Sequence, residues 1–364
     1  MNIRRMKKED FLEISSINET FYGVKRDASF WDWKYYRLPS GWHYMAVADM
    51  DGRIVGQIGC ICLLVSVNNE RITCGQTQDI LILEEFRKGR TFLKIEKKAH
   101  EMGIEQGVFF DFGFTIELTR KLSTRMLGFT AIGTIKKMVR PLNLYPYFAK
   151  KIPFKPLARL ASWFLKPFTK RFHLPTRCRL PGDWRLEKIT RFDGRFDILW
   201  SEAKDRYPVI LERSSEYLNW RYVDHPEVRY YCLMLRDGEH ILGFIVLEIK
   251  ERPRRFETLD IEYVDAKRGE IVDILVGPGT EMDRRFDFLL RGAFSYFVKH
   301  DVDVISCWCF PHMEIARHLA RYHFQQRQTP HDLIVRSYRS EIGPDSPIFQ
   351  TENWYMMRGD SDHY

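Results

Sequence analysis

The chain has 364 residues, of which 45% are hydrophobic and 14% aromatic, a composition that excludes a disordered chain and suffices for two hydrophobic cores. No apolar run reaches the ~20 residues of a membrane helix, and the N-terminal stretch lacks the apolar region of a signal peptide, so we expect a cytoplasmic protein. The seven cysteines have no metal-like spacing, which favours buried thiols over disulfides or zinc.

In chain order, the first elements alternate between strands and helices. A short strand (IRRM) precedes apolar residues at helical spacing between Phe11 and Phe21. Two strands joined by Asp51-Gly52 then predict a β-hairpin. A strand (QDILIL), a helix expected to close at Gly103, a strand (GVFFDFGF), a helix (ELTRKLSTRML) and a last strand follow.

The same order recurs about 190 residues later. The stretch FWDWKYYRLP is echoed by YLNWRYVDHP, QDILIL by VDILVG, and VFFDFGF by VISCWCF, and a second hairpin turn stands at Asp237-Gly238. This period is too long for a solenoid and suits duplicated domains. We therefore predict an α/β fold of tandem duplicated domains, each with a mixed, mostly antiparallel sheet flanked by helices, over residues 1–145 and 183–364.

Residues 146–182 form a basic, aromatic linker between these predicted domains. No acidic residue lies between Glu117 and Asp183, whereas fifteen Lys and Arg do. Three interpretations stay open for this segment. It is a linker packed on both domains, a peripheral membrane contact through residues 146–173, or a nucleic-acid contact, which we rank last because the basic excess extends into neither domain.

The element order, the opening IRRMKKED and the run DILILEEFRKGRTF before a helix resemble the GNAT superfamily of acyl-CoA-dependent N-acyltransferases. The LGF turn before the last strand is also typical of that family. The second unit, with YLNWRYVDHP, is similar to the second half of tandem GNAT-like proteins linked with bacterial envelope polysaccharide. The resemblance implies acetyl-CoA, or another acyl-CoA, as co-substrate and an amine as acceptor.

By this resemblance the CoA pyrophosphate binds the loop between the third long strand and the next helix. The family's loop reads Arg/Gln-x-x-Gly-x-Gly/Ala, whereas this chain has Arg at the fourth position and Phe at the last, so cradling by backbone amides is in doubt. Three basic side chains can still meet phosphate. The alternative interpretation of this loop is a basic first turn of the following helix that binds no ligand. The cofactor-binding residues implied are Ile80, Ile82, Arg87, Lys88, Gly89, Arg90 and Thr91.

The second unit has GPGTEMDRRFD at this place, where Glu281 and Asp283 would repel a pyrophosphate, so we expect CoA in the first unit. Asp79, the one carboxylate of QDILIL, is the candidate base for the acceptor ammonium. Asp273 occupies the matching place in the second unit, so a structural role for both stays open. Thr124 stands where the family often has the Tyr that protonates the leaving thiolate.

In the family, the region before the central hairpin lies near the acceptor cleft. The acceptor pocket implied here contains the repeated Trp and Tyr and a neighbouring histidine: Trp33, Tyr35, Trp220, Tyr222 and His225. The alternative is that these aromatic residues wedge helix against sheet. The histidines near the C-terminus lack HExxH spacing, so we predict no metal.

We therefore predict an acyl-CoA-dependent N-acyltransferase, acetyl in the first instance, acting on a small-molecule or glycan amine such as an amino sugar or envelope precursor. One rival is a Fem-type aminoacyl-tRNA-dependent transferase. The other is a catalytically silent binding protein of the same fold at the membrane surface. Apart from the aminoacyl-tRNA of the Fem-type rival, we do not expect a nucleic-acid partner. The oligomeric state stays open.

Overall fold

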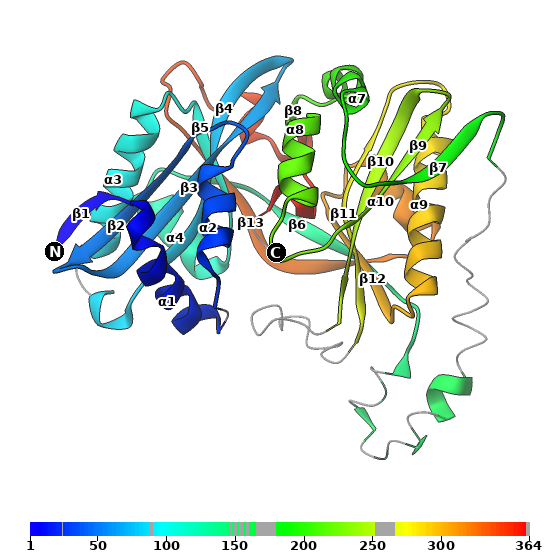
Figure 1. The fold of residues 1–364 in the computed structure, drawn as a ribbon, viewed down its shortest axis with the longest axis horizontal. Helices are drawn as coiled ribbons and strands as arrows, with labels where there is room; N and C mark the ends of the chain where they lie inside the picture. The colour runs from blue at the N-terminus through cyan, green and yellow to red at the C-terminus, as the bar shows by residue number, and fades with distance from the viewer. Residues whose placement is uncertain are drawn as a thin grey trace.

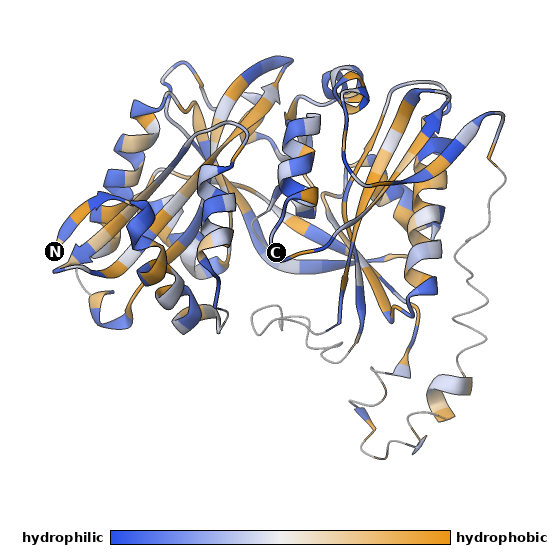
Figure 2. Cartoon of the chain, in the orientation of Figure 1, coloured by the Kyte–Doolittle hydropathy of each residue, from blue (hydrophilic) through white to orange (hydrophobic). Residues whose placement is uncertain are grey.

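The computed structural model describes residues 1–23, 25–87, 90–145, 148, 151–152, 154, 156–157, 160–164, 180–251 and 266–361. Its strands form one continuous sheet through two halves that stand side by side, each covered by helices (Figure 1). Hydrophobic residues gather along the central strands of both halves, where the cores lie (Figure 2). The predicted mixed α/β architecture is thereby confirmed.

The first half contains the elements expected from the sequence. Its strands are β1 (Asn2–Arg5), β2 (His43–Met50), β3 (Arg53–Val67), β4 (Glu70–Ile82), β5 (Phe110–Thr115) and β6 (Thr130–Pro141). Its helices are α1 (Phe11–Tyr22), α2 (Ala28–Trp31), α3 (Thr91–Glu105) and α4 (Glu117–Met126). Asp51 and Gly52 turn β2 into β3 with positive φ at both residues, as the hairpin prediction requires.

The second half repeats this order. Its strands are β7 (Trp184–Ile189), β8 (Val209–Leu211), β9 (Tyr231–Asp237), β10 (His240–Lys250), β11 (Arg268–Val276), β12 (Val304–Cys309), β13 (Gln325–Ser337) and β14 (Trp354–Tyr355). Its helices are α7 (Arg195–Ala203), α8 (Ser215–Leu218), α9 (Met282–Lys299) and α10 (Glu314–Arg321). The hairpin at Asp237-Gly238 is also present, between β9 and β10.

Both copies of the repeated aromatic stretch fold alike. Each begins at a capped short helix: Asp27 accepts hydrogen bonds from the first backbone amides of α2, and Ser214 does the same for α8. Each then continues as a π-helical turn, η2 (Asp32–Tyr36) in the first half and η5 (Asn219–Val223) in the second. Such turns are rare, so two at matching places indicate that the stretch has one conformation in both halves.

The last long strand of each half lies beside strands of the other half. β13 pairs with β5 on one side and β6 on the other, and β6 in turn pairs with β12. The sheet order is β1-β2-β3-β4-β5-β13-β6-β12-β11-β10-β9-β7, with β8 and β14 joined beside β3. The two halves therefore exchange strands. The domain boundaries at residues 145 and 183 stay a prediction. β6 ends before both boundaries, yet it pairs with the second-half strands β12 and β13.

The helices of the first half cover opposite faces of its sheet. A side chain at Gly56 would meet Ile95 of α3, whereas one at Gly59 would meet Tyr35 of η2. Because these glycines lie an odd number of residues apart on β3, they face opposite sides. The face under α3 and α4 and the face under α1, α2 and η2 are therefore separate, and a molecule that reached both would have to pass through the sheet.

One sequence expectation about α3 is wrong. The helix does not close at Gly103 but continues to Glu105, and the left-handed glycine after it is Gly107, with φ 72°. Gly103 is buried inside the helix. A Cβ at this position would lie 3.0 Å from the hydroxyl of Tyr44 and 3.1 Å from that of Tyr338, so the two hydroxyls leave no room for a side chain. Close packing, not helix termination, accounts for this glycine.

Candidate functional site

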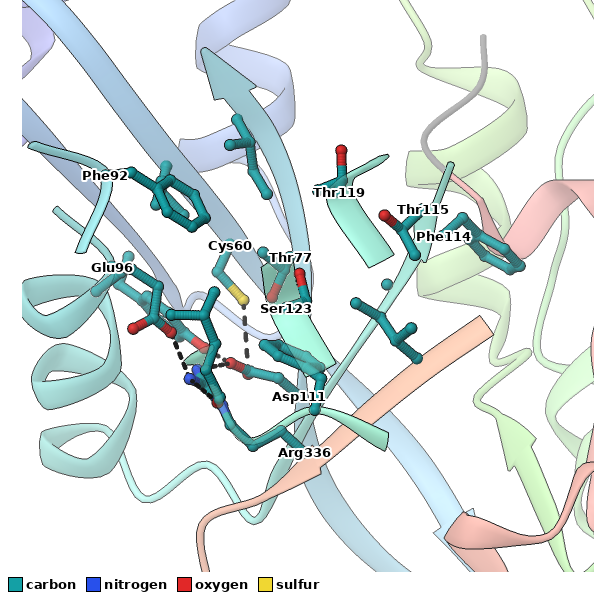
Figure 3. Close-up of a pocket in the computed structure, with 18 residues that line it drawn as sticks. Cys60, Thr77, Phe92, Glu96, Asp111, Phe114, Thr115, Thr119, Ser123 and Arg336 are labelled. Atoms are coloured by element: carbon teal, nitrogen blue, oxygen red, sulfur yellow. Dashed lines mark hydrogen bonds and ion pairs between the residues drawn. The ribbon is translucent and has the colours of Figure 1, made fainter. Parts of the chain in front are cut away.

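A pocket opens where β4 and β5 diverge, on the face covered by α3 and α4 (Figure 3). These two parallel strands, all of whose residues the structure describes, pair only along Cys74–Gln76 and Phe110–Phe112, whereas β5 pairs with β13 over its whole length. The pocket encloses about 530 Å³, its open mouth included. Its walls include residues of β4 and β5 (Thr77, Ile80, Gly113, Phe114, Thr115), α3 (Phe92, Glu96, Ala99), α4 and the turn after it (Thr119, Ser123, Leu127) and β13 (Ile334, Arg336).

The divergence coincides with a β-bulge in β4. Gly59 of β3 faces Gln78, but Gln57 faces Leu81, so β4 carries one extra residue there. Asp79 occupies the bulge with φ 50°, a left-handed conformation that is uncommon outside glycine. The bulge turns Ile80 into the pocket, whereas the Asp79 side chain contacts η2 on the opposite face.

The closed end of the pocket holds a buried charged network. Arg336 of β13 donates a hydrogen bond to Glu96 of α3 and, over 3.1 Å, to Asp111 of β5 (Figure 3). Asp111 also accepts hydrogen bonds from Tyr44, at 2.6 Å, and from Tyr338. The second half of the chain thereby completes a pocket whose other walls belong to the first half.

Burial disfavours the charged form of Arg336, but the oxygens of Tyr338 and Asp111 outweigh it and raise the pKa of the guanidinium. Burial raises the pKa of Glu96, which the Arg336 charge opposes. Burial, together with the Asp111 charge, raises the pKa of the Tyr44 phenol well above its usual value. Arg336 therefore stays positive and Tyr44 stays a neutral donor at physiological pH.

Glycines make the room for this network. A Cβ at Gly75 would lie 2.1 Å from Asp111 Oδ1 and 2.6 Å from the Tyr44 hydroxyl. Gly103 leaves the space above the two tyrosines. Neither glycine has a positive φ, so close approach, not backbone conformation, is what they provide.

The candidate base, Asp79, is a buried and hydrogen-bonded carboxylate. Lys34 Nζ lies 2.7 Å and the Tyr35 hydroxyl 2.6 Å from its Oδ2. Burial favours the neutral acid, but the charge and hydrogen bond of Lys34 and the hydrogen bond of Tyr35 outweigh it and lower the Asp79 pKa. Asp79 is therefore ionised at neutral pH.

The second half has a matching arrangement at the bulge of β11. The Tyr222 hydroxyl donates to Asp273 Oδ2 over 2.9 Å, as Tyr35 does to Asp79. Arg213 binds Asp273 as well, and also Asp360 near the end of the chain. Because the tyrosine–aspartate pair occurs in both halves, a structural role common to both is consistent with the geometry. The catalytic role of Asp79 stays a prediction.

The residues assigned to an acceptor pocket meet where the two halves touch. Trp33 and Trp220 stack on each other, and the His225 ring lies 4.2 Å from Trp33, measured between ring centroids. Tyr35 and Tyr222 extend from the same turns to the two bulges, and all five side chains are buried. None of them lines the pocket between α3 and α4. Their contact with an acceptor stays a prediction.

Of the residues assigned to CoA, Ile80 lines the pocket, and Lys88 and Gly89 fall outside the described residues. Ile82 is buried but does not line the pocket. Arg87 donates to the carbonyl of Ile82 over 3.1 Å, and exposed Arg90 precedes α3, whose first residue is Thr91. The first turn of α3 contains no acidic residue, whereas that of α9 contains Asp283, which pairs with Arg317 and Arg321. Electrostatically, the first helix start suits an anion and the second does not.

Thr124 was assigned as the partner of the leaving thiolate, but its hydroxyl donates to the carbonyl of Arg120 within α4, and Thr124 does not line the pocket. The neighbouring Ser123 does line it and is buried. Sequence reasoning missed Asp111, Glu96, Arg336 and the two tyrosines. A signal was present for Asp111, which is the one charged residue in the apolar run VFFDFGF.

In the described part of the chain, no group of three or more His, Cys, Asp and Glu side chains is placed to hold a metal ion. No described helix is long and apolar enough to cross a membrane. Six of the seven cysteines are described, and all six are buried free thiols, which agrees with the sequence prediction for them.

The comparisons with known proteins show a likeness to the GNAT fold. Residues 2–122, from β1 into α4, match the family model described as an acetyltransferase (GNAT) domain. No curated protein sequence matches the chain.

Among solved structures, the chain is similar to a probable N-acyltransferase of unknown function from Enterococcus faecalis V583, with a TM-score of 0.63 and 12% identity over 92% of this chain and 72% of that one. It is similar to N-myristoyltransferase from Saccharomyces cerevisiae with bound myristoyl-CoA, with a TM-score of 0.61 and 11% identity over 99% and 83%. It is also similar to a GCN5-related N-acetyltransferase from Anabaena variabilis, with a TM-score of 0.60 and 11% identity over 93% and 73%. At such identities the likeness establishes the fold.

Proposed function

We propose that the protein is an acyl-CoA-dependent N-acyltransferase whose first half holds the acyl-CoA. The observation that carries this proposal is the pocket at the β4 bulge, where β4 and β5 part between α3 and α4. Apolar walls such as Ile80, Phe92 and Phe114 suit the pantetheine arm and a short acyl chain. Arg87 and Arg90, beside a helix start without acidic residues, suit the pyrophosphate.

The second half has no comparable support for CoA, since Asp283 occupies the first turn of α9. Its contribution is β13, which supplies Ile334 and Arg336 to the pocket of the first half. The fixed positive charge of Arg336 and the network around it hold the closed end of the pocket in one shape. The two halves therefore form one site under this proposal.

In the proposed reaction the acceptor amine nitrogen bonds to the thioester carbonyl carbon, the carbon–sulfur bond breaks, and CoA leaves as the thiolate. The proton lost by the acceptor ammonium goes to a base, which we assign to Asp79, directly or through water. The second proton, which the nitrogen loses as the amide forms, goes to the leaving thiolate or to solvent. The hydrogen bonds from Lys34 and Tyr35 both reach Oδ2 of Asp79. Asp79 lies on the face opposite α3 and α4, so under this proposal the acyl group passes between the diverging strands β4 and β5. The acceptor would then enter under α1, α2 and η2, where Trp33 and Tyr35 lie.

Ser123 rather than Thr124 is the α4 hydroxyl beside the pocket, and a CoA thiolate is stable enough to leave without a dedicated acid. From the resemblance to the GNAT family, we assign acetyl as the acyl group. On the same ground we assign an amino sugar or an envelope precursor as the acceptor. A cytoplasmic location fits both substrates. A tandem duplication of one GNAT-like unit explains the matching element order.

The test is a calorimetric titration with acetyl-CoA, CoA and longer acyl-CoAs, beside the double variant Arg87→Glu/Arg90→Glu. We expect micromolar binding that the double variant loses, because two positive charges at the pyrophosphate become negative. Arg284→Glu is the matched control, since Arg284 is an exposed arginine in the first turn of the equivalent helix α9. Absence of binding for every acyl-CoA, or equal loss in the control, would contradict the proposal.

A further inference from the structure

A cluster of exposed apolar side chains lies in the basic segment between the two halves. The exposed fractions are 66% for Phe154, 50% for Leu157 and for Leu160, 64% for Trp163 and 61% for Phe164. Fifteen large hydrophobic residues are exposed in the described part of the chain, and these five fall within eleven consecutive positions. Single exposed apolar residues are ordinary, but such a cluster marks an interaction surface. We call these five residues the apolar ridge.

The ridge is anchored to the second half at its base. Leu142 N donates to the carbonyl of Asp303 over 2.7 Å, and Asn143 Nδ2 donates to Asp303 Oδ1 over 2.7 Å. The Ser162 hydroxyl in turn lies 3.5 Å from Asn143 Oδ1. Ser162 therefore faces this anchor while Trp163 and Phe164 beside it are exposed. In Figure 1 the described part of the segment lies below α9, away from the helices that cover the sheet.

Charge narrows the choice of partner. The chain has 57 Lys and Arg; without the nine in residues 146–182, 48 remain against 49 acidic residues, a net charge of −1. The positive excess of the whole protein is thus confined to the stretch that carries the ridge. Such a stretch attracts an anionic surface and repels a second copy of itself.

We propose that the apolar ridge docks the protein on an anionic lipid surface. Trp163 and Phe164 are of the type that enters the interface between headgroups and acyl chains, and basic neighbours attract anionic headgroups. A nucleic-acid strand would also attract basic residues, but Leu157 and Leu160 have no flat ring on which a base stacks. Burial in acyl chains accommodates all five side chains, so lipid fits the whole cluster and RNA fits part of it. The proposal stands apart from the proposed acyl transfer.

The experiment is co-sedimentation of the full chain with vesicles of phosphatidylcholine alone and of phosphatidylcholine mixed with phosphatidylglycerol. We expect binding to the mixed vesicles that weakens as salt is added, because screening reduces the attraction to the headgroups. Trp163→Ser/Phe164→Ser should weaken that binding about tenfold or more, since two side chains that enter the interface are lost. Trp42→Ser is the matched control, because Trp42 is 56% exposed in the first half, outside the ridge.

Three outcomes would overturn the proposal. The first is absence of sedimentation with the mixed vesicles. The second is equal loss in the ridge variant and in Trp42→Ser. The third is binding of a homopolymeric RNA, or a change of oligomeric state, that the ridge variant abolishes while vesicles stay unbound. The ridge residues are exposed, so the variant should keep the wild-type unfolding midpoint, and that measurement excludes misfolding as the cause.

Discussion

Trp33 and Trp220 stack face to face across the two halves, with ring centroids 5.0 Å apart and planes 15° from parallel. Trp33 Nε1 donates to the carbonyl of Trp220 over 2.8 Å, and Trp220 Nε1 donates to the carbonyl of Trp33 over 3.0 Å. The two bonds are reciprocal, as in an interface with two-fold symmetry. The repeated aromatic stretch of the sequence therefore contacts itself, and the contact joins the halves.

Removing either indole should destabilise the protein. Trp33→Ala or Trp220→Ala deletes a buried ring and leaves a carbonyl without its donor, so we expect a loss of about 3–5 kcal/mol in the free energy of unfolding. The double variant should lose less than the sum, because the two rings contact each other. Urea unfolding measures all three variants. Trp42→Ala, at an exposed indole, should change the free energy by less than about 0.5 kcal/mol. Additive losses would argue against a direct coupling.

Replacing Arg336 should affect the pocket of the other half. Arg336→Met leaves the buried carboxylate of Asp111 and the partly buried one of Glu96 without their positive partner, which costs about 3–5 kcal/mol of stability. Acyl-CoA affinity should fall as well if the proposed function is correct. Thermal unfolding and calorimetric titration report the two effects separately. Arg327→Ala is the control on the same strand, since Arg327 is exposed and contacts Gln325. Unchanged stability in Arg336→Met would show that the network does not support the fold.

Asp360 should make stability depend on pH. Burial raises its pKa from 3.8 to about 6, against the opposing charge of Arg213. The folded state therefore holds a proton between pH 4 and 6 that the unfolded state has released. This stabilising contribution is present below the unfolded pKa and is lost as pH rises through the folded pKa, by about 3 kcal/mol at most. The wild type minus Asp360→Asn difference in unfolding free energy should fall over that range. Parallel pH profiles of the two proteins would contradict the shifted pKa.

Variants of Asp79 and Asp273, the aspartates at the two β-bulges, should distinguish a catalytic role from a structural one. If Asp79 is the base, Asp79→Asn should lower kcat about 10²–10⁴-fold with a smaller change in the KM for acyl-CoA. Asp273→Asn is the matched change, because Asp273 holds the same tyrosine bond in the half without a CoA loop. Steady-state kinetics and unfolding of both variants decide the matter. Equal losses of stability with no selective loss of kcat would leave Asp79 a structural residue.

Local elements were predictable from the sequence. The hairpins at Asp51-Gly52 and Asp237-Gly238, the amphipathic helix from Phe11 and the repeated element order all have the form expected, because each follows from turn chemistry or apolar spacing over a few residues. Gly103 was mistaken for a helix end because a helix glycine that makes room for tyrosine hydroxyls has the same local signature as one that ends a helix.

Long-range pairing was not predictable. Nothing within VFFDFGF indicates that Asp111 meets Arg336, a residue 225 positions later in the chain. Ile80, which was assigned to CoA, lines the pocket, whereas the charged network of the pocket comes from β5, β13 and α3. Thr124 was assigned by counting from the LGF turn, whereas the rotation of α4 presents Ser123 to the pocket.

The strand exchange has a consequence for how the protein is made. The pocket of the first half lacks Ile334 and Arg336 until β13, which ends at Ser337, has been synthesised. A nascent chain that has only its first half outside the ribosome therefore exposes the unpaired edge of β5. β6 likewise has no strand partner until β12 and β13 have been synthesised. Early folding units of this protein should thus be incomplete sheets, and neither half expressed alone should form the site.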